Sequence, residues 1–196
     1  MAVSTRFTEL VGCELPLQLA PMGGVGTIEL AAAVAGAGGL GMVRNRGFRP
    51  PSGVCGTNFL MPFVPPIDQV AEAASASGIV EFSYGDPRTD LVKVARGQGA
   101  LVGWQVGSAA EARAAEERGC DYVVAQGIEA GGHVRGREPL EQLLAYVRSA
   151  VAIPVLAAGG IATAERVAGV MRLGADGVRV GTRFVVCSES RAPTLR

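Results

Sequence analysis

The sequence predicts a closed (β/α)₈ TIM barrel, and three observations support that fold class. Short apolar runs alternate with segments of helical periodicity along the whole chain, the order expected of a parallel sheet. Eight such runs occur, the number that closes a barrel. No change in composition divides residues 1–196, so a single domain is expected. The predicted strands start near Leu17, Leu40, Val54, Ile79, Leu101, Tyr122, Val155 and Val178.

The helices between these strands are predicted from capping residues and apolar periodicity. Thr27, Ser108 and Thr163 each precede a helical segment, and their hydroxyl groups can accept hydrogen bonds from the first turn. Glycines end several of these segments. The predicted helices cover residues 28–37, 67–77, 89–96, 109–118, 140–150 and 164–173.

Two parts of the predicted barrel are short. Residues 44–53 contain three arginines, two prolines and two glycines without apolar periodicity, so a loop is expected where a second helix would stand. The last strand is expected to span residues 177–184, and the chain stops soon afterwards. A doubly wound open sheet is the weaker alternative, because no Gly-x-Gly-x-x-Gly motif with a ribose-binding acid follows the first strand.

Composition and charge favour a small-molecule partner. Lys plus Arg and Asp plus Glu number 18 each, so no net field attracts nucleic acid or an anionic membrane. No apolar run approaches the roughly 20 residues of a membrane span, and the N-terminus lacks an apolar signal segment. A cytoplasmic location is therefore expected. Without a Cys-x-x-Cys pair, a zinc site or disulfide is not expected, and four buried or partly buried thiols are predicted at Cys13, Cys55, Cys120 and Cys187.

The loop after the sixth predicted strand carries the first candidate for catalysis. His133 is the only histidine in the sequence, and an imidazole is the side chain best suited to exchange protons near neutral pH. Gly131 and Gly132 precede it and would let a flat ligand approach the backbone. Parallel barrels place their sites at the carboxyl ends of strands, where this loop begins. Glu129 in the same loop could orient the loop, but a solvated carboxylate is the expected role.

The ends of the seventh and eighth predicted strands suggest a phosphate site. Gly159 and Gly160 follow one strand, and Gly181 and Thr182 lie near the end of the next. Barrels frequently bind phosphate there through backbone N–H groups, and a threonine hydroxyl can add a donor. Arg183 could neutralise a phosphate but could equally be a surface residue. Because the two glycine-containing loops follow adjacent strands, phosphate binding is favoured over a role in turn formation alone.

Together these motifs resemble the nitronate monooxygenases, formerly called 2-nitropropane dioxygenases. The likeness extends over nearly the whole chain in the family's order. That family consists of FMN-dependent (β/α)₈ barrels which oxidise alkyl nitronates, and some nitroalkanes, with dioxygen to carbonyl compounds and nitrite. The motifs are Ala20-Pro-Met-Gly-Gly24, Gly56-Thr-Asn-Phe59, Gln126-Gly-Ile-Glu-Ala-Gly-Gly-His133, Ala157-Ala-Gly-Gly-Ile161 and Gly174-Ala-Asp-Gly177 through Gly181-Thr-Arg-Phe184.

The resemblance implies a role for each matching residue. His133 would be the catalytic base above the flavin, while the remaining matches would bind FMN. Ala20, Pro21 and Met22 are expected against the isoalloxazine, Gly131 is expected to line the flavin face, and Gly23 is expected to contact the cofactor. Those expected to hydrogen-bond the ring or ribityl chain are Asn58, Gln105 and Gln126, and those expected to hold the phosphate are Gly159, Gly160, Gly181 and Thr182.

Two alternatives to this activity are open. One is an FMN-dependent enoyl-acyl-carrier-protein reductase of the related barrel type, which takes hydride from a nicotinamide cofactor. The other is a shortened paralogue that binds flavin or another phosphorylated ligand without turnover, or serves only in protein interaction. Residues 185–196 cannot form a long amphipathic helix to cover the first and last strands, so exposed apolar surface and a homodimer are expected.

Overall fold

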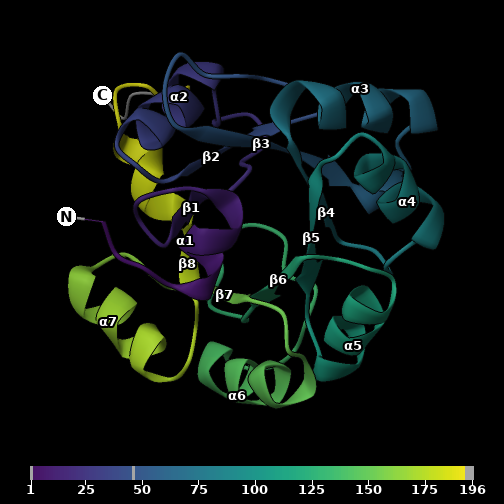
Figure 1. The fold of residues 1–196 in the computed structure, drawn as a ribbon. Helices are drawn as coiled ribbons and strands as arrows, with labels where there is room; N and C mark the ends of the chain where they lie inside the picture. Colours follow the sequence, from purple (N-terminus) through teal and green to yellow (C-terminus); the bar gives the residue numbers. More distant parts are fainter. Residues whose placement is uncertain (1, 46, 193–196) are drawn as a thin grey trace.

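Eight parallel strands close into one barrel in sequence order, with β8 paired to β1 (Figure 1). The structure is a computed structural model that describes residues 2–45 and 47–192. The predicted fold class, a (β/α)₈ barrel, is confirmed, and every strand begins within two residues of its predicted start. The strands are β1 (Leu17–Leu19), β2 (Leu40–Arg44), β3 (Val54–Leu60), β4 (Ile79–Ser83), β5 (Leu101–Val106), β6 (Tyr122–Gln126), β7 (Val155–Ala158) and β8 (Gly177–Val180).

Six helices surround the strands at the predicted positions (Figure 1). The three predicted caps are present: the hydroxyl groups of Thr27, Ser108 and Thr163 accept hydrogen bonds from the backbone three residues later, at 3.0, 3.2 and 3.3 Å. The helices are α2 (Ile28–Gly36), α3 (Ile67–Ser77), α4 (Thr89–Gly97), α5 (Ala109–Glu117), α6 (Leu140–Ala150) and α7 (Ala164–Arg172).

The connection between β2 and β3 contains no helix in its described part, as predicted, although Arg46 lies outside the described residues. Asn45 adopts the left-handed conformation at φ 57° and donates its N–H to the carbonyl of Asn58 at 3.0 Å. Gly53 also has a positive φ, and a methyl group there would overlap the carbonyl of Ala35 in α2. This connection is thus fitted closely against its neighbours.

Two elements differ from the sequence-based expectation. A six-residue helix, α1 (Arg6–Val11), precedes the first strand and was not predicted, because one and a half turns give too little periodicity. The last strand stops at Val180 instead of residue 184, because Gly181 leaves the extended conformation at φ −120°, ψ −78°. The chain then forms the 3₁₀ helix η2 (Thr182–Val186). The terminal stretch that includes Pro193 lies outside the described residues.

The barrel interior is closed at its amino end by α1. Phe7 and Val11 of this helix belong to a buried cluster with inward side chains of the strands, among them Leu40 and Leu156. The ring of Phe7 meets the ring of Tyr122 edge-on, with centroids 5.6 Å apart. A larger apolar cluster lies between the strands and the surrounding helices. The packed amino end leaves the carboxyl end as the accessible mouth.

The side of the barrel between α7 and α2 is covered by η2 and the residues after it (Figure 1). An apolar hollow of about 230 Å³ lies between α2 and this segment, with Leu17, Leu30 and Phe184 in its wall. Val186 on the same segment is 76% exposed. Apolar surface is therefore exposed here as expected, while the expected homodimer stays a prediction.

The four cysteines are free thiols, and each is buried or partly buried, as predicted. Burial raises the pKa of Cys55 to about 11 and that of Cys120 to about 12. Within residues 2–45 and 47–192, no helix is both long enough and apolar enough to cross a membrane.

Candidate active site at the mouth of the barrel

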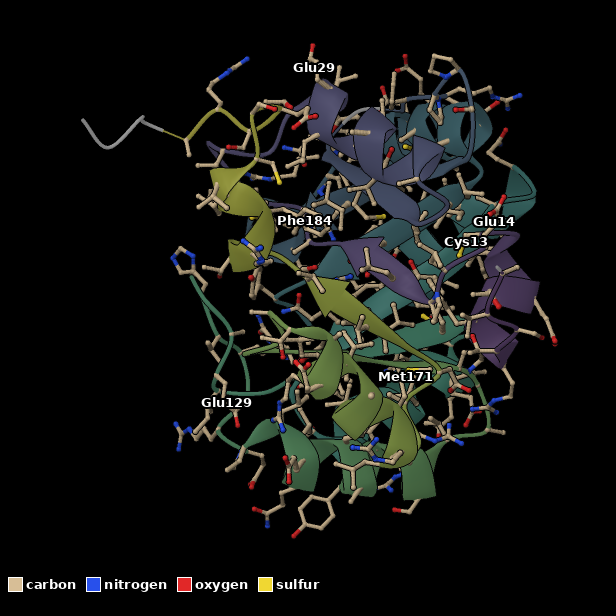
Figure 2. The ribbon with its side chains drawn as sticks, turned by 90° about the vertical axis from the view of Figure 1, so that its left-hand side faces the viewer. Cys13, Glu14, Glu29, Glu129, Met171 and Phe184 are labelled. Atoms are coloured by element: carbon tan, nitrogen blue, oxygen red, sulfur yellow. The ribbon has the colours of Figure 1, made fainter. Side chains whose placement is uncertain are left out.

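The carboxyl ends of all eight strands open onto one face, where the sequence-predicted site residues gather. Figure 2 shows Glu129 of the β6–α6 loop on this side of the molecule, with Cys13 and Glu14 at the opposite end. The loops that follow β6, β7 and β8 all lie at this face. Parallel barrels place their reactive groups at this end of the strands.

His133 lies in the exposed part of the β6–α6 loop and is held through its backbone. Its carbonyl accepts hydrogen bonds from the Tyr84 hydroxyl and from Nε2 of Gln126, each at 3.1 Å. The imidazole stands edge-on to the Tyr84 ring, with centroids 6.3 Å apart. Its ring nitrogens make no hydrogen bond to any other described residue. The imidazole is therefore free to contact a ligand.

Charged side chains anchor this loop at both ends. Both carboxylate oxygens of Glu129 accept the N–H of Leu140, at 3.1 and 3.0 Å, so Glu129 caps α6. Glu129 is exposed, as expected of a solvated carboxylate, and this contact also lets it orient the loop. At the other end Arg135 donates to Glu111 at 3.0 Å and to Asp86 at 2.6 Å. The histidine thus lies on a loop tied to the helices α5 and α6.

The glycines at the mouth bring separate loops into contact. A methyl group at Gly131 would lie 2.6 Å from Oγ1 of Thr182, so the absence of a side chain lets the histidine loop reach the end of β8. A methyl group at Gly181 would lie 3.0 Å from Cβ of Ala20 and 3.6 Å from Sδ of Met22. Five predicted site residues from β1, β6 and β8 are therefore neighbours.

Gly159 and Gly160 at the end of β7 both have positive φ, at 126° and 63°. Their conformations are accessible chiefly to glycine, so they are required by the turn itself. Added methyl groups would lie about 3.1 Å from the backbone N of Ala130 and from Cβ of Glu129 respectively. The β7 end thus packs on the histidine loop, while Arg183 beyond β8 is exposed.

Below the mouth, the predicted amide residues form a chain of hydrogen bonds. Gln105 donates Nε2 to Oε1 of Gln126 at 2.9 Å, and Gln126 in turn holds His133. Oε1 of Gln105 accepts a hydrogen bond from Arg179 at 3.0 Å. The chain therefore links the barrel interior to the backbone of the catalytic candidate.

An ion pair at the centre of the barrel was not predicted from the sequence. Arg179 of β8 and Glu81 of β4 are 5% and 0% exposed, and their side chains contact each other directly. Gln18 connects them: it donates to Glu81 at 2.9 Å and accepts from Arg179 at 2.7 Å. Tyr122 also donates to Glu81, at 3.2 Å. Burial and the Glu81 carboxylate raise the pKa of Tyr122 well above its usual value.

The signal for this buried group is one polar residue within each apolar strand. Gln18, Glu81 and Arg179 each interrupt such a run. Sequence alone does not tell whether an odd residue in a strand faces the interior or the helices, and the closed barrel decides it. Side chains of β1, β4 and β8 thereby meet although they are far apart in the sequence.

The amide nitrogen of Asn58 is fully hydrogen-bonded, whereas its amide oxygen has no partner among the described residues. Its Nδ2 donates to Glu81 at 3.0 Å and to Oγ of Ser83 at 2.8 Å. Its Oδ1 is buried and has no hydrogen-bonding partner among the described residues. A buried acceptor without a donor is unfavourable, so this oxygen suits a ligand that brings an N–H group.

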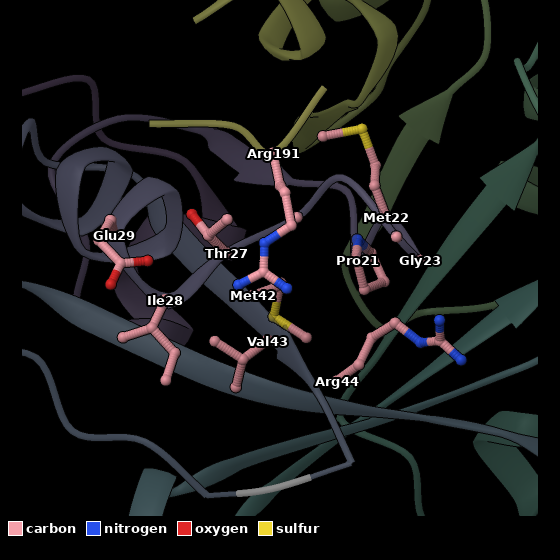
Figure 3. Close-up of a pocket in the computed structure, with 12 residues that line it drawn as sticks. Pro21, Met22, Gly23, Thr27, Ile28, Glu29, Met42, Val43, Arg44 and Arg191 are labelled. Atoms are coloured by element: carbon pink, nitrogen blue, oxygen red, sulfur yellow. The ribbon is translucent and has the colours of Figure 1, made fainter. Parts of the chain in front are cut away.

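A cavity of about 270 Å³ opens beside these residues, between the β1–α2 loop and the end of β2 (Figure 3). Its wall includes three predicted site residues, Pro21, Met22 and Gly23. Arg44 and Arg191 also line it, and neither was singled out from the sequence as a binding residue. The predicted site residues that follow β1 therefore line a cavity in the structure. Within the described ranges, no group of three or more His, Cys, Asp and Glu residues could hold a metal ion.

The closed parallel barrel, with polar groups at the carboxyl ends of its strands, has the architecture of (β/α)₈-barrel enzymes. Comparison with known proteins identifies the family. The model of the nitronate monooxygenase family matches residues 55–196. The nitronate monooxygenase of Pseudomonas aeruginosa is 32% identical over 97% of this chain and 71% of its own length. This chain therefore belongs to the nitronate monooxygenase family, which places it among the oxidoreductases.

Two solved structures superpose closely on this chain. Nitroalkane oxidase from Streptomyces ansochromogenes superposes with a TM-score of 0.81 at 32% identity, covering 97% of this chain and 71% of that one. FabK from Thermotoga maritima superposes with a TM-score of 0.86 at 35% identity, covering 96% of this chain and 64% of that one. Several curated relatives are longer, and this chain spans only 57% and 59% of two of them.

Proposed function

We propose that this chain uses FMN to oxidise alkyl nitronates, and some nitroalkanes, with dioxygen to carbonyl compounds and nitrite. The observation that carries the proposal is the free imidazole of His133 at the mouth of a barrel of this family. Because its backbone is held while its ring nitrogens are unengaged, the imidazole can accept a proton without breaking an internal bond. The names of the Pseudomonas and Streptomyces relatives support this substrate class.

The residues at the mouth fit an FMN molecule. The unpaired Oδ1 of Asn58 can accept the ring N–H of an isoalloxazine, and the backbone at exposed Gly160 and partly buried Gly181 can be approached by a phosphate. Ala20 and Met22 lie beside Gly181, so ring and phosphate contacts are close enough to belong to one ligand. Bound FMN would supply the redox chemistry that side chains lack.

In this proposal His133 acts on the substrate and its neighbours position it. The imidazole would take the proton from the carbon beside the nitro group of a neutral nitroalkane. A nitronate has already lost that proton, so it needs less from His133. Tyr84 and Gln126 fix the backbone of the loop, and exposed Gly131 and Gly132 keep the approach to the imidazole open.

The proposal is tested on the purified protein loaded with FMN. Its absorption spectrum should show a bound flavin, and anaerobic addition of an alkyl nitronate should bleach the visible absorption of that flavin in proportion to the nitronate added. Readmission of air should then restore the colour and release nitrite. A flavin-loaded protein whose spectrum no nitronate changes would contradict the proposed activity.

The phosphate part of the site has its own test. Gly181→Asp adds bulk and negative charge at the end of β8, and we expect it to weaken FMN binding at least tenfold. Gly169→Asp in α7 is the matched control, because a side chain there meets open space. Fluorescence titration of the apoprotein with FMN and riboflavin gives the readout. Equal affinity of the unsubstituted protein for both flavins would refute a phosphate site.

A flavin-dependent enoyl-acyl-carrier-protein reductase is kept as the second candidate, because FabK superposes as well as the nitroalkane oxidase does. Rapid anaerobic bleaching by NADH or NADPH, with none by a nitronate, would favour that reductase. A flavin that binds tightly but reacts with neither reagent would instead indicate a binding paralogue.

A further inference from the structure

The cavity beside the predicted flavin site has two arginines whose charges are not neutralised by the protein. Arg44 at the end of β2 and Arg191 beyond η2 both line it (Figure 3). Neither side chain has a salt bridge or hydrogen bond to another described residue. Nε of Arg44 is fully buried and still without a partner. Among the described residues, Arg44 therefore has neither an acceptor for this N–H group nor a carboxylate beside its charge, and an anion in the cavity would neutralise that charge.

The local backbone is shaped around these arginines. A methyl group at Gly23 would overlap the guanidinium of Arg44, so glycine is the residue that allows this side chain its place. The backbone N–H of Arg191 donates to the carbonyl of Val25 at 2.9 Å, which ties the segment after η2 to the β1–α2 loop. Residues far apart in the sequence are thereby brought to one cavity.

The other residues that line the cavity include both polar and apolar groups, a combination that suits an organic anion. The amino end of α2, a nine-residue helix, faces the cavity and adds partial positive charge. Glu29 is the one carboxylate among the residues that line the cavity, and it is exposed and pairs with neither arginine. Met22, Ile28 and Val43 give the cavity an apolar wall.

We propose that this cavity, the Arg44–Arg191 cavity, binds a phosphoryl group, either as free phosphate or on a small organic molecule. The guanidinium groups of Arg44 and Arg191 lie on different sides of the cavity (Figure 3), and together with the helix amino end they give it a positively charged lining that suits a dianion. A volume of about 270 Å³ leaves space beyond the anion for an apolar body. The site is distinct from the FMN-phosphate site predicted at Gly159 and Gly181, and it does not depend on nitronate turnover.

The test is isothermal titration calorimetry of the FMN-loaded protein with phenyl phosphate, inorganic phosphate and phenol. Phenyl phosphate should bind measurably and phenol should not. Arg44→Gln and Arg191→Gln should each weaken phenyl phosphate binding about tenfold or more. Arg137→Gln is the matched control, an exposed arginine of the β6–α6 connection that does not line the cavity, and should leave binding unchanged.

The relative affinities for phenyl phosphate and inorganic phosphate tell which kind of ligand the cavity binds, and either order is consistent with the proposed site. Tighter binding of phenyl phosphate than of inorganic phosphate assigns the cavity to an organic phosphate, and equal binding assigns it to free phosphate. Binding that is unchanged in both arginine variants, or lost equally in Arg137→Gln, would overturn the proposal. Should Arg44→Gln fail to fold, Arg191→Gln decides alone, because Arg191 is exposed.

A second measurement separates this site from the flavin phosphate. The ratio of FMN to riboflavin affinity should be unchanged in Arg44→Gln and reduced in Gly181→Asp. If Arg44→Gln abolishes the preference for FMN and Gly181→Asp does not, the cavity holds the flavin's own phosphate and the proposal is wrong.

Discussion

At the amino end of the barrel α1 packs Phe7 and Val11 against buried rings and aliphatic side chains, whereas at the carboxyl end exposed loops surround free polar groups. At the mouth, the imidazole of His133, Oδ1 of Asn58 and the guanidinium of Arg44 have binding capacity that the protein does not use. One end of this barrel is thus packed, whereas the other leaves unpaired polar groups that suit a ligand.

The largest expected effect is on activity and belongs to the mouth. His133→Asn should lower turnover of a neutral nitroalkane by about 10² to 10⁴-fold, because general-base catalysis is typically worth that much. Turnover of a preformed nitronate should fall much less. Since His133 is exposed, the free energy of unfolding should change by less than about 0.5 kcal/mol. Nitrite release and urea unfolding measure the two effects.

A loss below about tenfold on the neutral nitroalkane would remove His133 from the role of base. A large loss of stability in the same variant would instead show that the mouth also maintains the fold.

Much of the fold was predictable because strand and helix patterns are local. Capping at Thr27, Ser108 and Thr163 depends on residues three positions apart, and the sequence records such spacings directly. The predicted end of β8 was wrong because Val178 and Val180 before Gly181 and Phe184 after it look like one continuous strand, whereas the chain turns at Gly181 into η2.

Only the part of the site at the strand ends was predictable from the sequence. The predicted residues at the ends of β1, β6, β7 and β8 lie at the mouth, where closure of the barrel must bring strand ends together. The pairing of Glu81 with Arg179 joins strands that are not neighbours, so it depends on the side chains that face the interior. Arg44 and Arg191 meet for a similar reason: their cavity depends on where the chain passes after η2. Their roles in binding stay predictions.

The second largest effect should come from the ion pair that lies between the two ends. Arg179→Met leaves the buried carboxylate of Glu81 without its cation, and we expect a loss of about 3–5 kcal/mol in the free energy of unfolding. Adding Glu81→Gln should restore part of that loss, because the double variant holds no unpaired buried charge. Equilibrium urea unfolding of the single and double variants measures both values.

If Arg179→Met is as stable as the unsubstituted protein, the pair contributes nothing to the barrel. The double variant could lose more free energy of unfolding than the two single variants lose together. That result would show that the hydrogen bonds from Gln18 and Tyr122 to Glu81 outweigh the charge pairing.

The third effect tests the amino end directly. Phe7→Ala removes a fully buried ring that contacts Tyr122, and we expect the free energy of unfolding to fall by about 3 kcal/mol. Phe63→Ala is the matched control, since that ring is 77% exposed and should contribute less than about 0.5 kcal/mol. FMN affinity of the folded Phe7→Ala protein should be unchanged. A specific loss of FMN binding would show that the two ends are coupled through the barrel interior.

The smallest effect concerns how the mouth positions its histidine. Tyr84→Phe removes one of the two hydrogen bonds to the carbonyl of His133 and leaves the bond from Gln126. One such bond contributes about 1 kcal/mol, so turnover of a neutral nitroalkane should fall by less than about tenfold. Preformed nitronate should be affected least, because it does not need the proton transfer that the loop positions. Steady-state nitrite release with both substrates gives the ratio, and an equal loss on the two would place Tyr84 in substrate binding instead of in the positioning of His133.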